Sequence, residues 1–154
     1  MKPVLLVTGA SRGIGAATAV LAAQQGWRVV VNYSTNRTAA DKVVSQIEQA
    51  GGEAFAVQAD VGDEAQIMAM FQRIDSQWGR LDGLVNNAGV VDMPSRVDEM
   101  TVPRLERMFR LNVICSFLCA REAVRRMSTR HGHSGGVIVN LSRDRKSTRL
   151  NSSH

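Results

Sequence analysis

The sequence predicts an α/β domain in which a parallel β-sheet is covered by helices on both faces. Short apolar runs of strand length alternate with longer segments of helical periodicity, four times in succession, and a fifth apolar run follows. The runs lack the polar alternation of a half-exposed strand, which indicates strands buried on both faces. Three of the helical segments end at glycine, a residue that tolerates the left-handed backbone closing a helix.

The first strand, helix and second strand are expected within the first 31 residues. Residues 4–7 form a continuous apolar run that ends at Thr8 and Gly9. Residues 13–25 are rich in Ala, Leu and Gln and stop at a glycine, which predicts a helix. Residues 28–31 contain three consecutive valines and predict the second strand.

The middle of the chain repeats this order. Residues 38–50 place apolar side chains on one helical face and end at two glycines. Residues 54–57 predict the third strand. Asp63 is expected to cap the next helix, which Gly79 closes.

The last two strands flank the longest predicted helix. Residues 84–85 predict a strand that runs into a short polar segment at 86–89. After a polar connection, a helix is expected from about residue 103 to residue 130. Its apolar stripe is expected to pack on the sheet and consists of Leu111, Ile114, Phe117 and Leu118. Residues 137–139 predict the fifth strand.

Composition excludes several classes of protein. The chain of 154 residues, 44% hydrophobic, is long enough for one domain with a buried core. No apolar run reaches the roughly 18 residues of a membrane span, and the start resembles no signal peptide. The net charge of +5 would be compatible with nucleic-acid binding. However, residues 143–154 hold four basic residues and one acid, which leaves 15 basic and 13 acidic residues over 1–142. Since interleaved aromatics are also lacking, we expect neither a nucleic-acid nor a membrane partner.

Several side chains of the long helix and of the loop after it are expected to have structural roles rather than a function in binding or catalysis. Cys115 and Cys119 lie four residues apart without a complementary ligand cluster, so we expect small buried residues in a reduced, cytoplasmic protein and no metal site. His131 and His133 are expected to be exposed. We expect a solvated face, favoured by the helix dipole, for the four arginines Arg121, Arg125, Arg126 and Arg130.

The strongest local signal joins the first strand to the first helix. Residues 8–15 read Thr-Gly-Ala-Ser-Arg-Gly-Ile-Gly, a Gly-x-x-x-Gly-x-Gly spacing. Glycines allow a tight turn and close approach of the backbone to a pyrophosphate, and the helix N-terminus offers free N–H groups and a positive dipole end. The position of this turn after a buried strand predicts nucleotide binding.

Together with Asn86-Asn87-Ala88-Gly89 and Asp60-Val61, the turn resembles the short-chain dehydrogenase/reductase family, and within it the ketoacyl-reductase and glucose-dehydrogenase-like oxidoreductases. The resemblance covers residues 3–142. It implies a Rossmann-type, doubly wound sheet in the order 3-2-1-4-5, which in this chain ends after the fifth strand. It also implies an NAD(P)-dependent oxidoreductase that transfers hydride between nicotinamide and a carbonyl or alcohol. A non-catalytic NAD(P)-binding or sensing module is the alternative.

The resemblance also implies which residues bind the cofactor. The turn would line the phosphates and the neighbouring ribose through Gly9, Ser11, Arg12, Gly13, Ile14 and Gly15. Asn32 and Ser34 would border the cofactor at the end of the second strand. Asp60 would bond the adenine amino group beside the Val61 backbone, although Asp60 could instead be a helix cap. Asn87, Ala88 and Gly89 would pass the adenosine side, whereas Asn86 would tie neighbouring strands together.

The cofactor is expected to be NADP, with NAD as the alternative. Enzymes that prefer NAD usually carry an acid near the end of the second strand, and residues 30–34 contain none. Arg12 stands at a position where the NADP-preferring members of the resembled family also carry a basic residue. Its guanidinium could pair with a 2′-phosphate. Arg37 could assist or could be a solvated residue in the first turn of its helix.

The catalytic groups of the resembled family are incomplete in this chain. Asn112 matches the helix asparagine that holds a water of the proton relay there, although it could be an ordinary polar residue. A tyrosine of ordinary pKa near 10 needs an adjacent lysine to work at neutral pH. The single tyrosine, Tyr33, is followed four residues later by an arginine. Ser142 matches the first serine of a family pair, and Arg143 stands at the catalytic position. The chain as given is therefore expected to be inactive.

Residues 143–154 are expected not to be native. Asp144 to His154 resembles the in-frame translation of a sequencing-library adapter. We therefore expect residues 1–142 to be the N-terminal part of a longer NAD(P)-binding domain. By the same resemblance, the full-length protein is expected to form a dimer or tetramer through the long helix and to act on a small molecule.

Overall fold

The computed structural model describes residues 1–89 and 95–142. Five parallel strands form one sheet in the order β3-β2-β1-β4-β5, as predicted. The strands are β1 (Val4–Val7), β2 (Arg28–Tyr33), β3 (Ala54–Gln58), β4 (Gly83–Asn86) and β5 (Val137–Asn140). The strand order confirms the doubly wound architecture, because the chain builds outward from β1 in one direction and then in the other.

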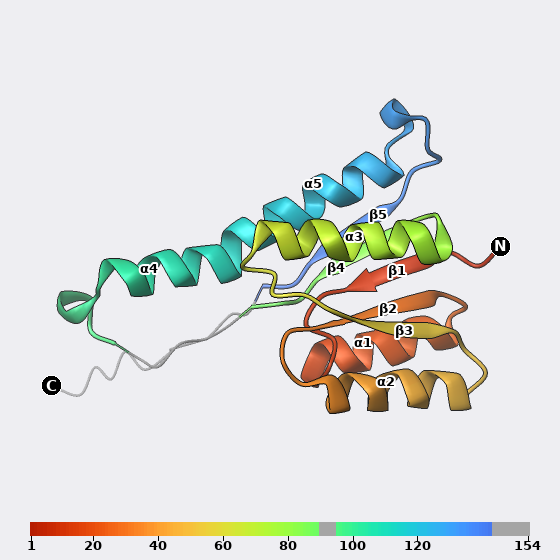
Figure 1. Cartoon of the computed structure of the whole chain (residues 1–154), viewed down its shortest axis with the longest axis horizontal. Coiled ribbons are helices and arrows are strands. Elements are labelled where there is room, and N and C mark those ends of the chain that lie inside the picture. The colour runs from red at the N-terminus through yellow and green to blue at the C-terminus, as the bar shows by residue number, and fades with distance from the viewer. Residues whose placement is uncertain (90–94, 143–154) are drawn as a thin grey trace, which may run out of the picture.

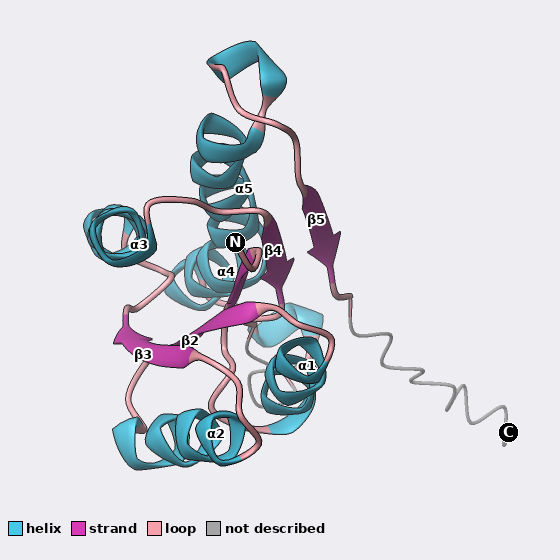
Figure 2. Cartoon of the chain, turned by 90° about the vertical axis from the view of Figure 1, so that its right-hand side faces the viewer, coloured by secondary structure: helices cyan, strands magenta, loops and turns pink. Residues whose placement is uncertain are grey.

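Helices cover both faces of the sheet (Figure 2). On one face lie α1 (Gly13–Gln24) and α2 (Arg37–Gln49), and on the other lie α3 (Glu64–Trp78) and α5 (Cys115–Met127). Within β1, Val4 and Leu6 belong to the core beneath α3 and α5, while Leu5 and Val7 belong to the core beneath α1 and α2. The period-two geometry of a strand thus places one apolar run into two cores, which explains why the run shows no polar alternation.

The predicted helix ends are supported by local chemistry. Asp63 Oδ1 accepts the N–H of Ala65 at 2.9 Å and begins α3, and Gly79 closes that helix at φ +67°. Asn36 Oδ1 accepts the N–H of Ala39 at 2.9 Å and begins α2. The residue before α1, Arg12, has extended backbone and makes no side-chain cap. No side chain therefore caps the backbone N–H groups in the first turn of α1.

The long helix predicted over 103–130 is present but is not regular. It consists of α4 (Val102–Phe109), the π-helical turn η2 (Arg110–Ile114) and α5, and the short 3₁₀ turn η3 (Thr129–His131) follows. A further 3₁₀ turn, η1 (Val97–Glu99), precedes α4. Figure 1 shows α4 extending beyond the end of the sheet, while α5 lies over it. Helical periodicity does not reveal a single π turn, and such turns are frequent at functional sites.

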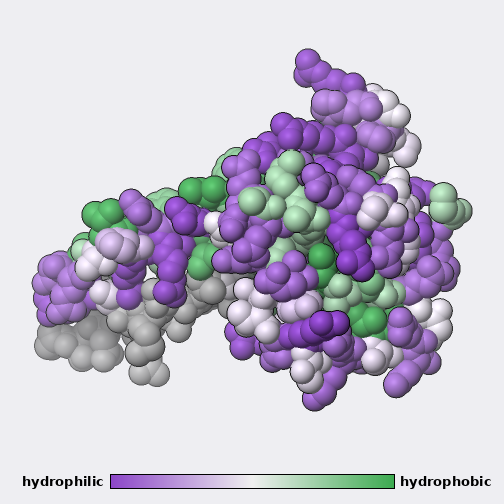
Figure 3. Space-filling model, viewed as in Figure 1, coloured by the Kyte–Doolittle hydropathy of each residue, from purple (hydrophilic) through white to green (hydrophobic). Residues whose placement is uncertain are grey.

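The expected packing of the apolar stripe on the sheet is only partly correct. Leu118 packs against the core, but Ile114 is 47% exposed and Phe117 is 73% exposed. They belong to an outer apolar face, visible in part in Figure 3, made by the exposed residues Val102, Leu105, Phe109, Val113, Ile114, Phe117 and Val124. The four residues predicted as one stripe therefore do not all face the core, since Leu118 packs inward while Ile114 and Phe117 face outward.

The expectation of a solvated arginine face is only partly correct, because Arg125 and Arg130 are exposed while the Arg126 side chain is only 17% exposed. Glu122 is 2% exposed, and its carboxylate accepts bonds from Arg121 at 2.9 Å and Arg125 at 2.8 Å. Arg126 bonds the same carboxylate at 3.2 Å and also pairs with Asp75 of α3 at 2.8 Å. A buried charge needs such partners, and net charge along a sequence does not show burial.

Burial alone would raise the pKa of Glu122, but the hydrogen bonds from Arg121 and Arg126 outweigh it and hold the pKa below its usual value. The prediction that both cysteines are buried is confirmed, since both free thiols lie in the core, and burial raises the pKa of Cys119 to about 12. Among the described residues no group of three or more candidate ligands could hold a metal ion. Both histidines of the loop before β5 are exposed, as expected.

Candidate cofactor-binding site

The glycine turn lies at the carboxyl edge of the sheet, where β1 and β4 end side by side (Figure 1). This is the topological switch point, since β1 connects to β2 on one side while β4 pairs on the other. In open α/β sheets, ligands bind in the crevice outside the carboxyl ends of the strands at this point. The fold therefore places the predicted phosphate-binding residues where such a ligand enters.

The backbone of the turn requires its glycines. Gly9 and Gly13 have φ values of +60° and +59°, a region that side chains disfavour. A Cβ on Gly15 would overlap the side-chain amide of Asn87 and the carbonyl of Gly9, and one on Gly9 would lie 3.1 Å from Ala88 Cα. Gly9 and Gly15 thus let the turn lie directly against the segment that follows β4, whereas Gly13 is favoured by its backbone conformation alone.

Hydrogen bonds join the turn to the segment 87–89. Asn87 Nδ2 donates to the carbonyls of Thr8 at 3.1 Å and Gly9 at 2.9 Å. Thr8 Oγ1 accepts the backbone N–H groups of Asn87 and Ala88, each at 3.0 Å. The two motifs that are 79 residues apart in sequence therefore form one hydrogen-bonded unit. The role of Thr8 was missed from the sequence, because its hydroxyl is recognised only when β4 is placed beside β1.

Asn32 supports the turn from behind. It is 2% exposed, its Oδ1 accepts the Gly9 N–H at 3.1 Å, and its Nδ2 donates to the carbonyl of Ala59 at 3.3 Å. Because the Asn32 side chain is buried, it acts on the turn by holding the Gly9 backbone in position. Ser34, one residue beyond β2, is exposed at the same edge.

Asp60 and Val61 begin the loop between β3 and α3. Asp60 Oδ1 accepts the Gly62 N–H at 2.8 Å, and Val61 is 8% exposed. The alternative that Asp60 is a helix cap is wrong, because Asp63 caps α3. The Asp60 carboxylate is exposed at the carboxyl edge, where it is available to a ligand.

Asn86 ties strands together, as expected. Its Nδ2 donates to Asn140 Oδ1 on β5 at 2.9 Å and to the carbonyl of Ser116 on α5 at 3.3 Å. Asn86 is 5% exposed, and its side chain lies between β4, β5 and α5. It therefore holds β4 in place directly before the segment 87–89.

Asn112 lies in the π turn η2. Its Nδ2 donates to the Met108 carbonyl at 3.0 Å, and its Oδ1 lies 2.8 Å from the position that a Cβ on Gly89 would occupy. The structure thus brings the predicted catalytic asparagine against the last residue of the predicted cofactor segment. A side chain on residue 89 would make the Asn112 amide shift.

The residues of the turn that face solvent carry the remaining predicted contacts. Ile14 is 59% exposed, Ser11 is half-buried and Arg12 is exposed. Within the described residues Arg12 forms no ion pair, whereas Arg37 in the first turn of α2 lies 3.7 Å from Asp41. The Arg12 guanidinium is therefore available to an anion at this edge.

This arrangement fits a dinucleotide. Gly9 and Gly15 pack against Asn87 and Ala88 with no room for a Cβ, a Cβ on Gly13 would meet nothing within 4 Å, and α1 begins beside the turn without a side-chain cap. Free N–H groups at a helix N-terminus together with a free guanidinium suit phosphates. The Asp60 carboxylate nearby suits an amino group on a base.

Comparison with known proteins agrees with this geometry. The family model described as short chain dehydrogenase matches residues 3–147. The chain belongs to the short-chain dehydrogenase family. Its fold and motif order therefore confirm what the sequence resemblance implied about family and fold class.

Individual family members are similar over the same region. The chain is 52% identical over 139 residues to the uncharacterized oxidoreductase YgfF of Escherichia coli, covering 90% of this chain and 56% of that protein. It is 43% identical over 136 residues to the versicolorin reductase stcU of Emericella nidulans, covering 88% and 49%. The short-chain dehydrogenase/reductase from Serratia marcescens superposes with a TM-score of 0.82 at 36% identity, covering 90% and 54%. The chain thus spans about half the length of these relatives.

The other groups of the family's catalytic set are not brought to this site by the described residues. Tyr33, the only tyrosine, is 9% exposed at the end of β2 and belongs to the core beneath α1 and α2. Ser142 is exposed just beyond β5. Arg143 and the predicted non-native segment 143–154 lie outside the described residues, as do residues 90–94.

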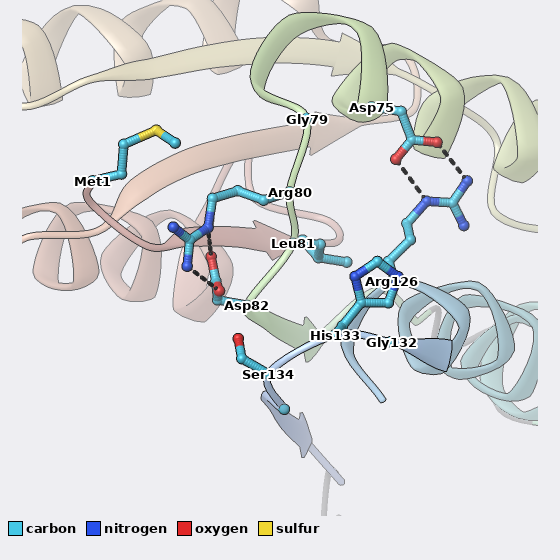
Figure 4. Close-up of a pocket in the computed structure, with 11 residues that line it drawn as sticks. Met1, Asp75, Gly79, Arg80, Leu81, Asp82, Arg126, Gly132, His133 and Ser134 are labelled. Atoms are coloured by element: carbon cyan, nitrogen blue, oxygen red, sulfur yellow. Dashed lines mark hydrogen bonds and ion pairs between the residues drawn. The ribbon is translucent and has the colours of Figure 1, made fainter. Parts of the chain in front are cut away.

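A cavity of about 460 Å³ opens at the opposite, amino edge of the sheet (Figure 4). Its charged walls are already paired: Arg80 holds Asp82 at 2.6 Å, and Arg126 holds Asp75 at 2.8 Å. Burial would raise the pKa of Asp82, but hydrogen bonds from Arg80 and the Val4 N–H lower it. Since these charges already have partners in the fold, the glycine turn is the better candidate for the functional site. No helix of the described part has the length and apolar character needed to cross a membrane.

Proposed function

We propose that this chain is the cofactor-holding part of an NAD(P)-dependent oxidoreductase that acts on a carbonyl or alcohol group of a small molecule. The observation that carries the proposal is the cradle in which Gly9 and Gly15 lie against Asn87 with no space for a side chain. Family membership supports it, and so does the name reductase carried by the relative stcU. The nicotinamide cofactor would supply or accept the hydride.

The residues of the chain would divide the work of holding that cofactor. The turn from Gly9 to Gly15 would bind the phosphates through backbone N–H groups. Asp60 would accept a bond from the adenine amino group, beside the Val61 backbone, and Ala88 and Gly89 would border the adenosine. Asn32 and Asn87 would act on the cofactor indirectly, since their amides hold the turn in shape.

Asn112 would hold a water of the proton relay, positioned by its bond to the Met108 carbonyl. The sequence contains no tyrosine followed four residues later by lysine, so a tyrosine activated by a neighbouring ammonium is missing. We therefore expect the chain as given to bind the cofactor without turnover. Since residues 143–154 are proposed to be non-native, the activity proposed here is that of the longer protein.

The preferred cofactor is proposed to be NADP, because Arg12 is exposed and β2 ends in Val-Asn-Tyr without an acid. The test is a fluorescence titration of the chain with NADPH and NADH. NADPH is expected to bind more tightly, and Arg12→Ala is expected to weaken NADPH about 10-fold while sparing NADH, as for loss of a charge-assisted bond. Arg130→Ala, at the amino edge, is the matched control. No binding of either nucleotide would refute the function, and equal loss for both would refute the role of Arg12.

The full-length protein is further proposed to be a cytoplasmic homo-oligomer, a dimer or tetramer. The outer apolar face on α4, η2 and α5 supports self-association, because contiguous exposed apolar side chains mark interaction surfaces. The two free, buried thiols support a reducing compartment.

A further inference from the structure

We propose that Arg110 contacts the adenine base of the cofactor and stacks its guanidinium on the face of that base. The inference rests on the proposed function and assigns to it a residue of the π turn η2. Asn112 in the same turn is the predicted catalytic asparagine, whereas Arg110 has had no role so far.

The π turn packs directly on the loop that carries Asp60. A Cβ on Gly62 would lie 2.9 Å from Leu111 Cδ2, 3.1 Å from Asp60 Oδ1 and 3.6 Å from Arg110 Cδ. The side chains of Asp60 and Arg110 therefore both reach within 4 Å of one point, although they come from segments 50 residues apart. Because Gly62 has no side chain, η2 packs this closely on the loop.

Arg110 is exposed and takes part in no ion pair within the described ranges 1–89 and 95–142. Other arginines of the same helical segment differ, since Arg121, Arg125 and Arg126 all bond the Glu122 carboxylate. Asp60 accepts the Gly62 N–H but likewise forms no ion pair within the described ranges. Asp60 Oδ1 and the aliphatic stem of Arg110 thus lie near one point at the carboxyl edge, and neither residue has an ion-pair partner in the described part of the chain.

An adenine base would satisfy both groups. Its amino group donates to a carboxylate at the ring edge, which leaves the face of the ring for another contact. A guanidinium is planar, always charged and weakly hydrated, and it stacks on aromatic faces. Asp60 would therefore accept a hydrogen bond at the edge of the base, and Arg110 would stack on its face.

The test measures binding of two adenine nucleotides, 5′-AMP and 2′,5′-ADP, by displacement of NADPH from the chain. Arg110→Ala is expected to weaken both by the same factor, about 3- to 10-fold. Arg110→Lys keeps the charge and the aliphatic stem but loses the plane, so a smaller loss is expected. Arg130→Ala is the matched control and is expected to bind both as the wild type does. Thermal melting followed by circular dichroism verifies that each variant is folded.

The alternatives give different results. A loss confined to 2′,5′-ADP would place Arg110 on the 2′-phosphate and overturn the proposal. Wild-type affinity in Arg110→Ala, or an equal loss in Arg130→Ala, would also overturn it. Failure of the wild-type chain to bind NADPH would instead contradict the proposed function, so the two failures are distinguishable.

Discussion

The two edges of the sheet use charged and polar groups in opposite ways. At the amino edge a cavity of about 460 Å³ is bordered by Arg80–Asp82 and Arg126–Asp75, and each of these four charges has its partner within the chain. At the carboxyl edge the polar groups that lie behind the surface, Asn32 and Asn87, bond the backbone of the glycine turn. The groups at the surface, Arg12, Asp60 and Arg110, remain without ion pairs in the described part of the chain.

This difference shows that the size of a cavity does not identify a binding site. A side chain that has satisfied its charge within the fold gains little from a ligand, because binding would have to break the existing pair. A site instead needs buried groups that hold its shape and exposed groups that are still free. By this criterion we expect the amino edge to contribute to stability and the carboxyl edge to binding.

The largest expected effect concerns stability alone. Glu122→Ala leaves three guanidinium groups beside a removed carboxylate, and loss of one partner from a buried ionic network costs about 3–5 kcal/mol. Urea denaturation would measure the free energy of unfolding. The exposed Glu48→Ala is the control, with an expected change within about 0.5 kcal/mol. If Glu122→Ala, while still folded, bound NADPH much more weakly, the separation between the two edges would fail.

Gly15→Ala is the next largest change and acts on binding. The added methyl group overlaps Asn87 and the Gly9 carbonyl, and overpacking of this kind costs about 1–3 kcal/mol. The affinity for NADPH is expected to fall about 10- to 100-fold. Gly132→Ala at the amino edge, where φ is +84°, should destabilise the fold by about 1 kcal/mol and leave affinity unchanged. Equal affinities of the two variants would contradict the account.

Thr8→Val tests the connection between the turn and β4. The isosteric change removes the acceptor for the N–H groups of Asn87 and Ala88, and leaving buried donors without a partner costs about 1–2 kcal/mol. Both stability and NADPH affinity should decrease, because the same bonds hold the fold and the site. The exposed Thr38→Val serves as control. A change in stability with intact affinity would show that the turn keeps its shape without Thr8.

The smallest effect is the pH dependence of stability. The pKa values of Glu122 and Asp82 are lowered in the folded protein, so both groups stabilise it at neutral pH. That stability is lost as pH falls below their ordinary values near 4, at a slope of at most about 1.4 kcal/mol per pH unit for each proton. Glu122→Gln should flatten the slope measured by thermal melting between pH 5 and about pH 3. An unchanged slope would mean that other carboxylates control acid stability.

Much of the fold followed from the sequence because its signals are local. Apolar runs, glycine stops and the Asp63 cap each act within a few residues, and the family motifs then gave the strand order. The prediction that Asn86 ties neighbouring strands came from the family resemblance, and it is correct although the bond to Asn140 joins residues 54 positions apart.

What the sequence did not reveal depends on contacts between distant segments. The π turn that carries Asn112 and Arg110 has the same apolar spacing as a regular helix, so periodicity predicted one long helix. The burial of Glu122 depends on α3, which lies about 50 residues earlier in the chain. Arg110 acquires a role only because η2 packs on the loop after β3. Spacing within one segment contains none of this information.

The central claim, that the carboxyl edge is the cofactor site, is tested most directly by recording the backbone amide resonances of the isotope-labelled chain during titration with NADPH. The account predicts that saturable shifts concentrate at residues 9–15, 60–62 and 87–89. The amides around the amino-edge cavity, at 79–82 and 132–135, should stay unchanged. Shifts concentrated at the cavity, with the glycine turn unaffected, would contradict it.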